Sequence, residues 1–157
     1  MITCTFAAMA TSGADLEHAI SLLKQDKLVA IPTETVYGLA GNALSREAVV
    51  RIFEAKSRPF FDPLIAHVPS AESVDKYAKD IPKIAKDLMN RFWPGPLTLV
   101  LNKKDIIPDL VTSGLSTVGL RMPAQPLTLE LLSRIDFPLA APSANPFGYI
   151  SPTSAAH

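Results

Sequence analysis

LVAIPTETVYGLAGNALSREAVVRIFEAK, residues 28–56, holds two strands, a polar loop and a helix in one stretch. LVAI at 28–31 predicts a short buried strand that ends at Pro32, because proline cannot donate to a sheet ladder. The loop and strand of TETVYGLA follow, and Ser45 is a plausible helix N-cap. The apolar stripe expected on this helix is Val49, Ile52 and Phe53. The stretch therefore predicts strands that alternate with helices.

The alternation continues on both sides of this stretch. Apolar residues within 16–23 follow helical spacing, with Ser12 or Asp15 as possible caps. Pro126 suits a first helical turn, so a helix is predicted from there. One or two helices are predicted over roughly 70–92, and the side chains expected to face the core are Ile84, Leu88, Met89 and Phe92. Further strands are predicted at LIAHV (64–68), LTLVLN (97–102), TVGLR (117–121) and PLAA (138–141).

The composition fits one globular domain of this alternating kind, α/β or α+β with a mixed sheet. The chain has 157 residues, of which 48% are apolar and 19% charged, enough for a sizeable core. No run of 18 apolar residues occurs, so no membrane span is predicted. The single Cys4 cannot form an internal disulfide, which fits a reducing compartment and a cytoplasmic protein.

The charge balance argues against a protein whose main task is to grip nucleic acid. Lys and Arg total 15, Asp and Glu total 15, and the net charge is zero, whereas a polyanion-binding protein usually carries a basic excess. Small anionic substrates are therefore favoured. The histidines, His18, His67 and His157, have no metal-ligand spacing with one another or with a cysteine, so no metal site is predicted.

Four polar segments rich in Gly and Pro adjoin predicted strand ends. They are IPTETVYGL (31–39), EAKSRPFFDPLIAHV (54–68), SGLSTVGLRMP (113–123) and APSANPFGYISPTSAAH (141–157). Ligands of open α/β sheets gather at such loops, where backbone donors and side chains converge. Neither a P-loop nor a G-x-G-x-x-G motif is present, so a nucleotide would bind through another architecture.

Two of these segments carry charged or titratable side chains whose role the residues alone leave open. Lys56 and Arg58, followed by the rigid Pro59, suit a clamp for phosphate or carboxylate, although cations are also common at a helix C-terminus. His67 in an apolar strand is either a hydrogen-bonded core residue or, on the face opposite Ala66 and Val68, a ligand contact.

Hydroxyl and amide side chains mark the other segments. Thr117 follows a hydroxyl-rich turn and precedes Arg121, as at a nucleotide or amino-acid carboxylate site, or simply in an ordinary turn. Ser143 and Asn145 lie in a turn between prolines and either reach outward or cap local backbone. Ser151 before Pro152 predicts a helix start with an anion site, and this close to the C-terminus it predicts a fragment that lacks its C-terminal part.

Taken in order, the segments resemble the YrdC-like family of L-threonylcarbamoyladenylate synthases. The matching pieces are IPTETVYGLAGNA, the K-x-R-P of Lys56 to Pro59 with PLIAHV, WPGPLTLVL, SGLSTVGLRMPAQP and APSANPFGYISPTSAAH. The resemblance implies a twisted mixed sheet with flanking helices around an open, electropositive cleft, within one catalytic domain over 1–157. It also implies a reaction in which L-threonine, bicarbonate or CO2, and ATP with Mg²⁺ give threonylcarbamoyl-AMP and pyrophosphate. A partner enzyme then modifies adenine 37 of tRNA.

Site residues carry over from the family position by position. The resemblance implies that Thr35, His67 and Arg121 hold threonine, with the backbone near Ala141 also in contact. The residues implied for the ATP and pyrophosphate side are Lys56, Arg58, Asp62, Thr117, Ser143, Asn145 and Ser151. Lys56 and Arg58 are the expected catalytic pair, because preplaced cations offset the charge that builds on the phosphoryl oxygens.

Two departures and two alternatives accompany the resemblance. Asp62 stands where the family usually has Asn, and its carboxylate would repel phosphates unless Mg²⁺ or Arg58 offsets it. Gln125 replaces a common His. The alternatives are a YrdC-like module that binds double-stranded RNA or tRNA without catalysis, and a related enzyme acting on carbamoyl-adenylate or another amino acid. Salt-dependent RNA binding would mark the first, and an acceptor other than threonine the second.

Overall fold

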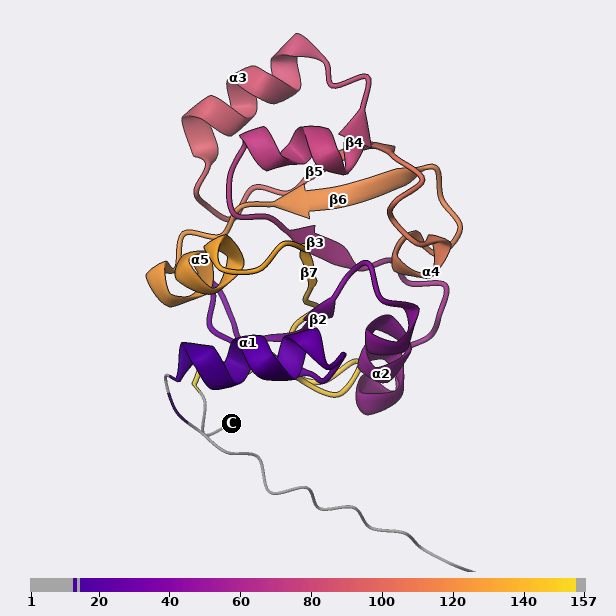
Figure 1. Cartoon of the computed structure of the whole chain (residues 1–157). Coiled ribbons are helices and arrows are strands. Elements are labelled where there is room, and N and C mark those ends of the chain that lie inside the picture. The colour runs from indigo at the N-terminus through magenta and orange to yellow at the C-terminus, as the bar shows by residue number, and fades with distance from the viewer. Residues whose placement is uncertain (1–12, 14, 155–157) are drawn as a thin grey trace, which may run out of the picture.

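Seven strands form one mixed sheet in the computed structural model, which describes residue 13 and residues 15–154 (Figure 1). The strand order is β1-β2-β7-β3-β6-β5-β4. The strands are β1 (Val29–Ile31), β2 (Gly38–Asn42), β3 (Ile65–His67), β4 (Ala78–Lys79), β5 (Leu99–Lys103), β6 (Thr117–Arg121) and β7 (Leu139–Ala140). The helices are α1 (Leu16–Lys24), α2 (Arg46–Lys56), α3 (Lys83–Phe92), α4 (Asp109–Thr112) and α5 (Pro126–Ser133), with a 3₁₀ helix η1 (Glu72–Lys76).

The centre of the sheet is a parallel pair within an otherwise antiparallel order. β3 and β6 run parallel, with Ile65 opposite Gly119 and His67 opposite Arg121. β7 lies antiparallel to both β2 and β3. The predicted mixed sheet and its α/β class are therefore confirmed.

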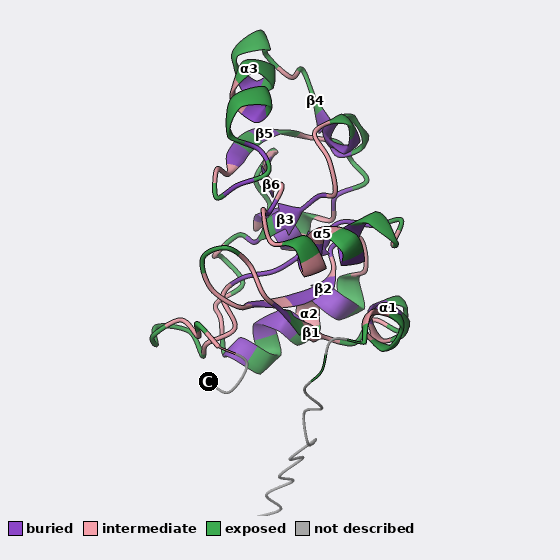
Figure 2. Ribbon diagram, turned by 90° about the vertical axis from the view of Figure 1, so that its left-hand side faces the viewer, coloured by how far each residue is buried: buried purple, intermediate pink, exposed green. Residues whose placement is uncertain are grey.

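Each face of the sheet has its own hydrophobic cluster. Successive strand residues point to opposite faces, and in β7 Leu139 belongs to one cluster while Ala140 belongs to the other. The larger cluster joins α2, η1 and α3 to β3, β5 and β6. The smaller one joins α1 and α5 to β1, β2 and β7. Figure 2 shows the buried residues of the strands in purple, with the helices set beside them and their exposed residues in green.

Local capping explains why the helices begin where the sequence predicts. The Asp15 side chain accepts a hydrogen bond from the His18 backbone N–H at 3.0 Å, and Ser45 accepts one from Ala48 at 3.3 Å. Pro126 occupies the first turn of α5, as predicted. The strand predicted over 117–121 is also confirmed.

The segment 70–92 departs from the prediction. A short strand, β4, separates η1 from α3, and only Ala85 and Met89 of α3 are buried. Ile84 and Phe92, predicted to face the core, are 64% and 48% exposed. α3 lies at the β5–β4 edge of the sheet. Its buried stripe consists of Ala85 and Met89, four residues apart, and is narrower than the four-residue stripe predicted from the sequence.

The helix predicted to begin at Ser151 is wrong over the described residues. Residues 151–154 form coil and bends, and the Pro152 carbonyl accepts a hydrogen bond from the Tyr37 backbone N–H at 2.9 Å. This bond ties the segment to the loop before β2. Three residues invoked above, Cys4, Ser12 and His157, lie outside the described residues. Within the described residues, no helix is long and apolar enough to cross a membrane.

Candidate active site

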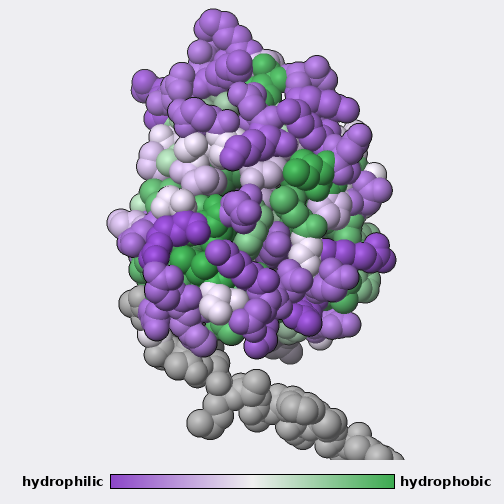
Figure 3. Space-filling view, in the orientation of Figure 1, coloured by the Kyte–Doolittle hydropathy of each residue, from purple (hydrophilic) through white to green (hydrophobic). Residues whose placement is uncertain are grey.

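One face of β3, β6 and β5 is left open by the helices. The smaller cluster covers this face only as far as β7, since it contains no residue of the next three strands. Ile65 in β3 is 36% exposed and Val100 in β5 is 67% exposed. Figure 3 shows hydrophobic side chains at the surface of the molecule among hydrophilic ones. The site residues predicted on the strands, His67, Thr117 and Arg121, point to this face because their neighbours Ala66, Val118 and Leu120 are core residues.

Arg121 is the centre of a first group of polar side chains. Its Nη2 donates to Glu34 Oε1 at 2.7 Å and to Thr35 Oγ1 at 3.3 Å. Glu34 Oε2 accepts in turn from the Ala124 backbone N–H at 3.1 Å. The loop between β1 and β2 is thereby held against the end of β6. We call Glu34, Thr35, His67 and Arg121 the Arg121 cluster.

The electrostatics of this cluster favour an ionised Glu34 and a neutral His67. Burial raises the pKa of Glu34, but the hydrogen bonds from Arg121 and from backbone N–H groups outweigh it and lower the pKa below its usual value. Burial, reinforced by the charge of Arg121, lowers the pKa of His67 to about 4. His67 is only 3% exposed, and its Nδ1 has no hydrogen-bond partner among the described residues.

Lys56, the last residue of α2, anchors a second group. Its Nζ donates to the backbone carbonyls of Ser143 and Asn145, and its own carbonyl accepts from the Phe147 backbone N–H at 2.9 Å. The residue is 2% exposed. Burial lowers the pKa of the Lys56 ammonium, and the nearby charge of Arg58 lowers it further. Lys56 therefore closes the turn of residues 143–147 onto the end of α2.

Arg58 lies in the loop that leads from α2 to β3. It pairs with Asp62 at 2.7 Å and donates to the carbonyls of Asp62 and Pro63 at 3.3 and 3.2 Å. Its guanidinium also lies 5.6 Å from the ring centre of Phe147. Asp62 is thus offset by Arg58, one of the two ways its charge was expected to be balanced. We call Lys56, Arg58, Asp62, Ser143 and Asn145 the Lys56 cluster.

Residues 141–144 connect the two clusters. The Ala141 N–H donates to the Ile65 carbonyl at 3.2 Å, and the Ala144 N–H donates to the Tyr37 carbonyl at 2.8 Å. Gly38 pairs with Ser143 in an isolated bridge, where a Cβ on Gly38 would lie 3.2 Å from the Cβ of Ala141. This close approach favours glycine at the start of β2.

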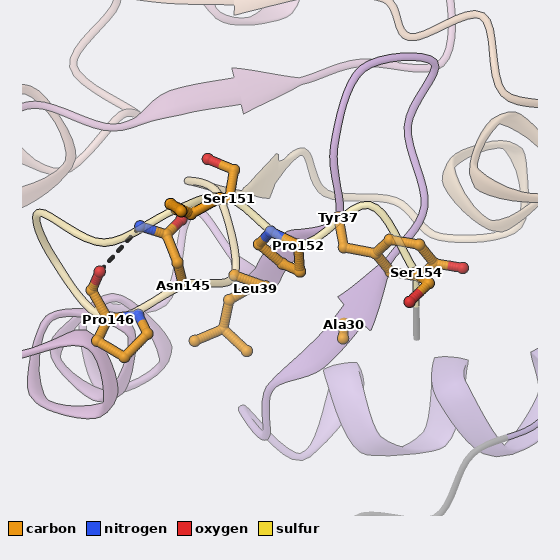
Figure 4. Close-up of a pocket in the computed structure, with 10 residues that line it drawn as sticks. Ala30, Tyr37, Leu39, Asn145, Pro146, Ser151, Pro152 and Ser154 are labelled. Atoms are coloured by element: carbon orange, nitrogen blue, oxygen red, sulfur yellow. Dashed lines mark hydrogen bonds between the residues drawn. The ribbon is translucent and has the colours of Figure 1, made fainter. Parts of the chain in front are cut away.

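A pocket of about 440 Å³ lies beside the Lys56 cluster (Figure 4). It is lined by Ala30, Tyr37, Leu39, Ala144, Asn145, Pro146, Ile150, Ser151, Pro152 and Ser154. The Asn145 side-chain amide donates to the carbonyls of Pro146 and Tyr149 at 2.8 and 2.7 Å. Its Oδ1 is buried and, within residues 15–154, has no hydrogen-bond partner. The Asn145 side-chain nitrogen thus stabilises the turn that contains it, whereas its side-chain oxygen has no partner within residues 15–154.

Most of the predicted residues lie in or beside these two groups, Ser151 lines the pocket, and Thr117 belongs to neither group. Thr117 begins β6, at the end of the strand opposite Arg121, and pairs with Asn102 of β5. Ser151 lines the pocket from a non-helical segment. Sequence reasoning missed Glu34 as a site residue. Its signal was present, because Glu34 is the one charged residue in the strand-end segment 31–39.

The arrangement can hold an anion and a polar small molecule. Arg121 offers a guanidinium beside the open face, His67 an unused nitrogen and Thr35 a hydroxyl. Arg58 and Lys56 add cationic groups on the other side of residues 141–144. Among the described residues, no group of three or more His, Cys, Asp or Glu side chains suits a metal ion.

Comparisons with known proteins identify sequences and structures that this chain resembles. The family Sua5_yciO_yrdC, described as "Telomere recombination", matches residues 21–157. The threonylcarbamoyl-AMP synthase of Pyrococcus abyssi is 55% identical over 139 residues, which cover 88% of the chain and 41% of that protein. The synthase of Bacillus subtilis is 47% identical over 150 residues, which cover 95% of the chain and 43% of that protein. The chain therefore spans about two fifths of the length of these relatives.

Among solved structures, P. abyssi Sua5 complexed with L-threonine superposes with a TM-score of 0.90 at 51% identity. The match covers 94% of this chain and 44% of that one. Full-length HypF in the phosphate- and nucleotide-bound form reaches a TM-score of 0.78 at 27% identity, over 91% of this chain and 22% of that one. Because the family match covers nearly the whole chain, this protein belongs to the Sua5/YciO/YrdC family.

Proposed function

We propose that the chain is the catalytic domain of an L-threonylcarbamoyl-AMP synthase. The observation that carries the proposal is the Arg121 cluster, an arginine, a buried neutral histidine and a threonine hydroxyl at one edge of an open sheet face. The relatives named threonylcarbamoyl-AMP synthase and the neighbour complexed with L-threonine support it. The reaction would convert L-threonine, bicarbonate or CO2, and ATP into threonylcarbamoyl-AMP and pyrophosphate.

In this proposal the Arg121 cluster holds the amino acid. Arg121 pairs with the threonine carboxylate, while Thr35 and His67 contact its polar groups, with the backbone at Ala141 nearby. His67 is suited to this role because a neutral imidazole can offer Nδ1 as donor or acceptor. Sequence reasoning left His67 between core residue and ligand contact. His67 is 3% exposed, and its Nδ1 has no hydrogen-bond partner within residues 15–154, so the ligand contact is our proposal for this nitrogen.

The Lys56 cluster would then face the nucleotide. The threonine ammonium first releases a proton to solvent, and the free amine then adds to CO2 and releases a second proton, which gives a carbamate. The carbamate oxygen attacks the α-phosphorus as pyrophosphate leaves. Arg58 and Lys56 stabilise the charge on the phosphoryl oxygens and on the departing pyrophosphate. Thr117, Ser143, Asn145 and Ser151 supply hydroxyl and amide groups around the phosphates. Mg²⁺ would arrive with ATP as part of the substrate.

The product is a precursor for the N6-threonylcarbamoyl group at adenine 37 of tRNA. A transferase that receives the activated threonylcarbamoyl group is therefore the proposed partner. We propose the cytoplasm as the compartment of the reaction. Net zero charge keeps direct, phosphate-led RNA binding as the weaker alternative.

The test is threonine-dependent release of pyrophosphate from ATP, with threonylcarbamoyl-AMP identified by mass spectrometry. We expect Arg58→Ala to lower kcat by about 100-fold with the fold intact, as for loss of one transition-state charge. Arg51→Ala is the matched control, because Arg51 lies on α2, before the loop that carries Arg58, and its guanidinium donates to the Asp26 carbonyl. Activity with another amino acid but not threonine would reject the substrate. Salt-sensitive RNA binding without turnover would favour the RNA-binding module.

A further inference from the structure

Glu34 has no role in the reaction described above, yet it is held more firmly than any other acid near the site. One carboxylate oxygen accepts from Arg121 at 2.7 Å, and the other accepts from the Ala124 backbone N–H at 3.1 Å. Both contacts bridge about 90 residues of sequence, from the loop after β1 to the end of β6. A carboxylate fixed at both oxygens cannot swing away without breaking two hydrogen bonds.

The charge of the Arg121 cluster follows from these contacts. Arg121 is positive, and Glu34 remains ionised because its pKa is lowered. His67 has a pKa of about 4, so it is neutral at pH 7. The cluster is therefore electrically neutral near pH 7, although it contains the arginine proposed to bind a carboxylate. A neutral subsite in which a positive and a negative group lie side by side complements a molecule that carries one charge of each sign.

Arg121 keeps donors for a ligand while it holds Glu34. Within the described part of the chain, both of its side-chain hydrogen bonds are made by Nη2, and its Nε is buried without a partner. A buried donor without a partner is costly, and a bound carboxylate would satisfy it. Glu34 thus leaves one edge of the guanidinium available and fixes the plane of the group.

We propose that Glu34 is a positioning and specificity residue that makes the subsite select a zwitterionic amino acid. Its contact with Arg121 orients the guanidinium toward the ligand carboxylate. Its own negative charge stabilises the ligand ammonium and disfavours anions that lack one. The inference rests on the proposed function, which places L-threonine in this subsite.

The test compares L-threonine with 2,3-dihydroxybutanoate of the same configuration, which replaces the ammonium by a hydroxyl and keeps the rest of the molecule. Dissociation constants are measured by calorimetry at pH 7. We expect the wild-type chain to prefer threonine by at least tenfold. Glu34→Gln should reduce this preference at least fivefold, because an amide cannot balance the ammonium charge, while Glu34→Asp should retain most of it.

The control is Glu17→Gln, which removes the acid of the exposed Arg134–Glu17 ion pair and should leave the preference unchanged. An unchanged preference in Glu34→Gln, or equal binding of both ligands by the wild-type chain, would overturn the inference. The second outcome needs no variant, so it decides even where Glu34→Gln fails to fold. Failure of the wild-type chain to bind threonine at all would instead overturn the proposed function, and this inference with it.

Discussion

The Arg121 cluster and the Lys56 cluster are built in different ways. Two members of the first, His67 and Arg121, are fixed by strand register, and Arg121 reaches Glu34 and Thr35 side chain to side chain. In the second, Lys56 and Arg58 bind mainly backbone carbonyls of loops. The Arg121 cluster is therefore positioned by the strands of the sheet, whereas the Lys56 cluster holds the loops beside the sheet in place.

A cation near a site can therefore stabilise the folded loops and, in the same position, contribute charge for a ligand. The Lys56 ammonium is buried and already bonded to two carbonyls, so in the proposed function it would act on a ligand through the turn that it holds as well as by its charge. Among the described residues, the buried Nε of Arg121 has no hydrogen-bond partner. Substitutions in the two clusters should therefore fail differently.

The largest effect is expected for Lys56→Met. The change leaves the carbonyls of Ser143 and Asn145 without their donor, and we expect the free energy of unfolding to fall by about 2–4 kcal/mol. Turnover should fall by about 100-fold or more, because the turn and the charge are lost together. Urea unfolding and the pyrophosphate assay measure the two effects.

Lys24→Met is the control for this change, since Lys24 also ends a helix but is exposed. It should alter neither quantity by more than experimental error. Loss of turnover in Lys56→Met with undiminished stability would mean that Lys56 acts only on the ligand, and the contrast between the clusters would disappear.

The next effect concerns pH and the Arg121 cluster alone. His67 has a pKa of about 4 in the folded chain and its ordinary pKa of 6.5 in the unfolded chain. Between pH 6.5 and pH 4, His67 therefore binds a proton in the unfolded chain but not in the folded chain. The resulting stability is fully present above pH 6.5 and is lost as pH falls toward 4. It amounts to about 3 kcal/mol at most.

Unfolding free energies of wild type and His67→Gln, measured from pH 7 to pH 4.5, test this expectation. The difference between the two proteins should shift as pH falls, because carboxylates common to both cancel. His18→Gln, which replaces an exposed histidine, is the matched control variant. A His67→Gln profile parallel to wild type would show that His67 titrates normally.

Much of the fold followed from local patterns. The caps Asp15 and Ser45, the proline at the start of α5 and the alternation in 117–121 each act within a few residues, so the sequence contains the whole cause. The exposure of Ile84 and Phe92 depends on the position of α3 at the sheet edge, which no local pattern reveals. Ser151 does not begin a helix within the described residues, and the carbonyl of the next residue, Pro152, instead accepts a long-range hydrogen bond from the Tyr37 N–H.

The site was predictable in its residue types and less so in its contacts. The motif resemblance named Thr35 and Arg121, which do meet. It could not say that Glu34 occupies Nη2 of Arg121, or that Lys56 binds carbonyls 87 and 89 residues away, because such pairings arise only when the sheet order is known. The roles of these residues in catalysis remain predictions for the experiments above.

The smallest effect is expected for Asp62→Asn, which installs the residue that the family usually has. Asp62 pairs with Arg58 at 2.7 Å, and both side chains are partly exposed, so stability should change by less than about 1 kcal/mol. Removal of the carboxylate leaves the Arg58 charge free to attract phosphates, and the KM for ATP should fall about two- to threefold. Asp87→Asn, which breaks the exposed Lys83–Asp87 pair, should leave KM unchanged. A higher KM in Asp62→Asn would instead mean that Asp62 aims Arg58 at the nucleotide, and the Lys56 cluster would then depend on side-chain pairing as the Arg121 cluster does.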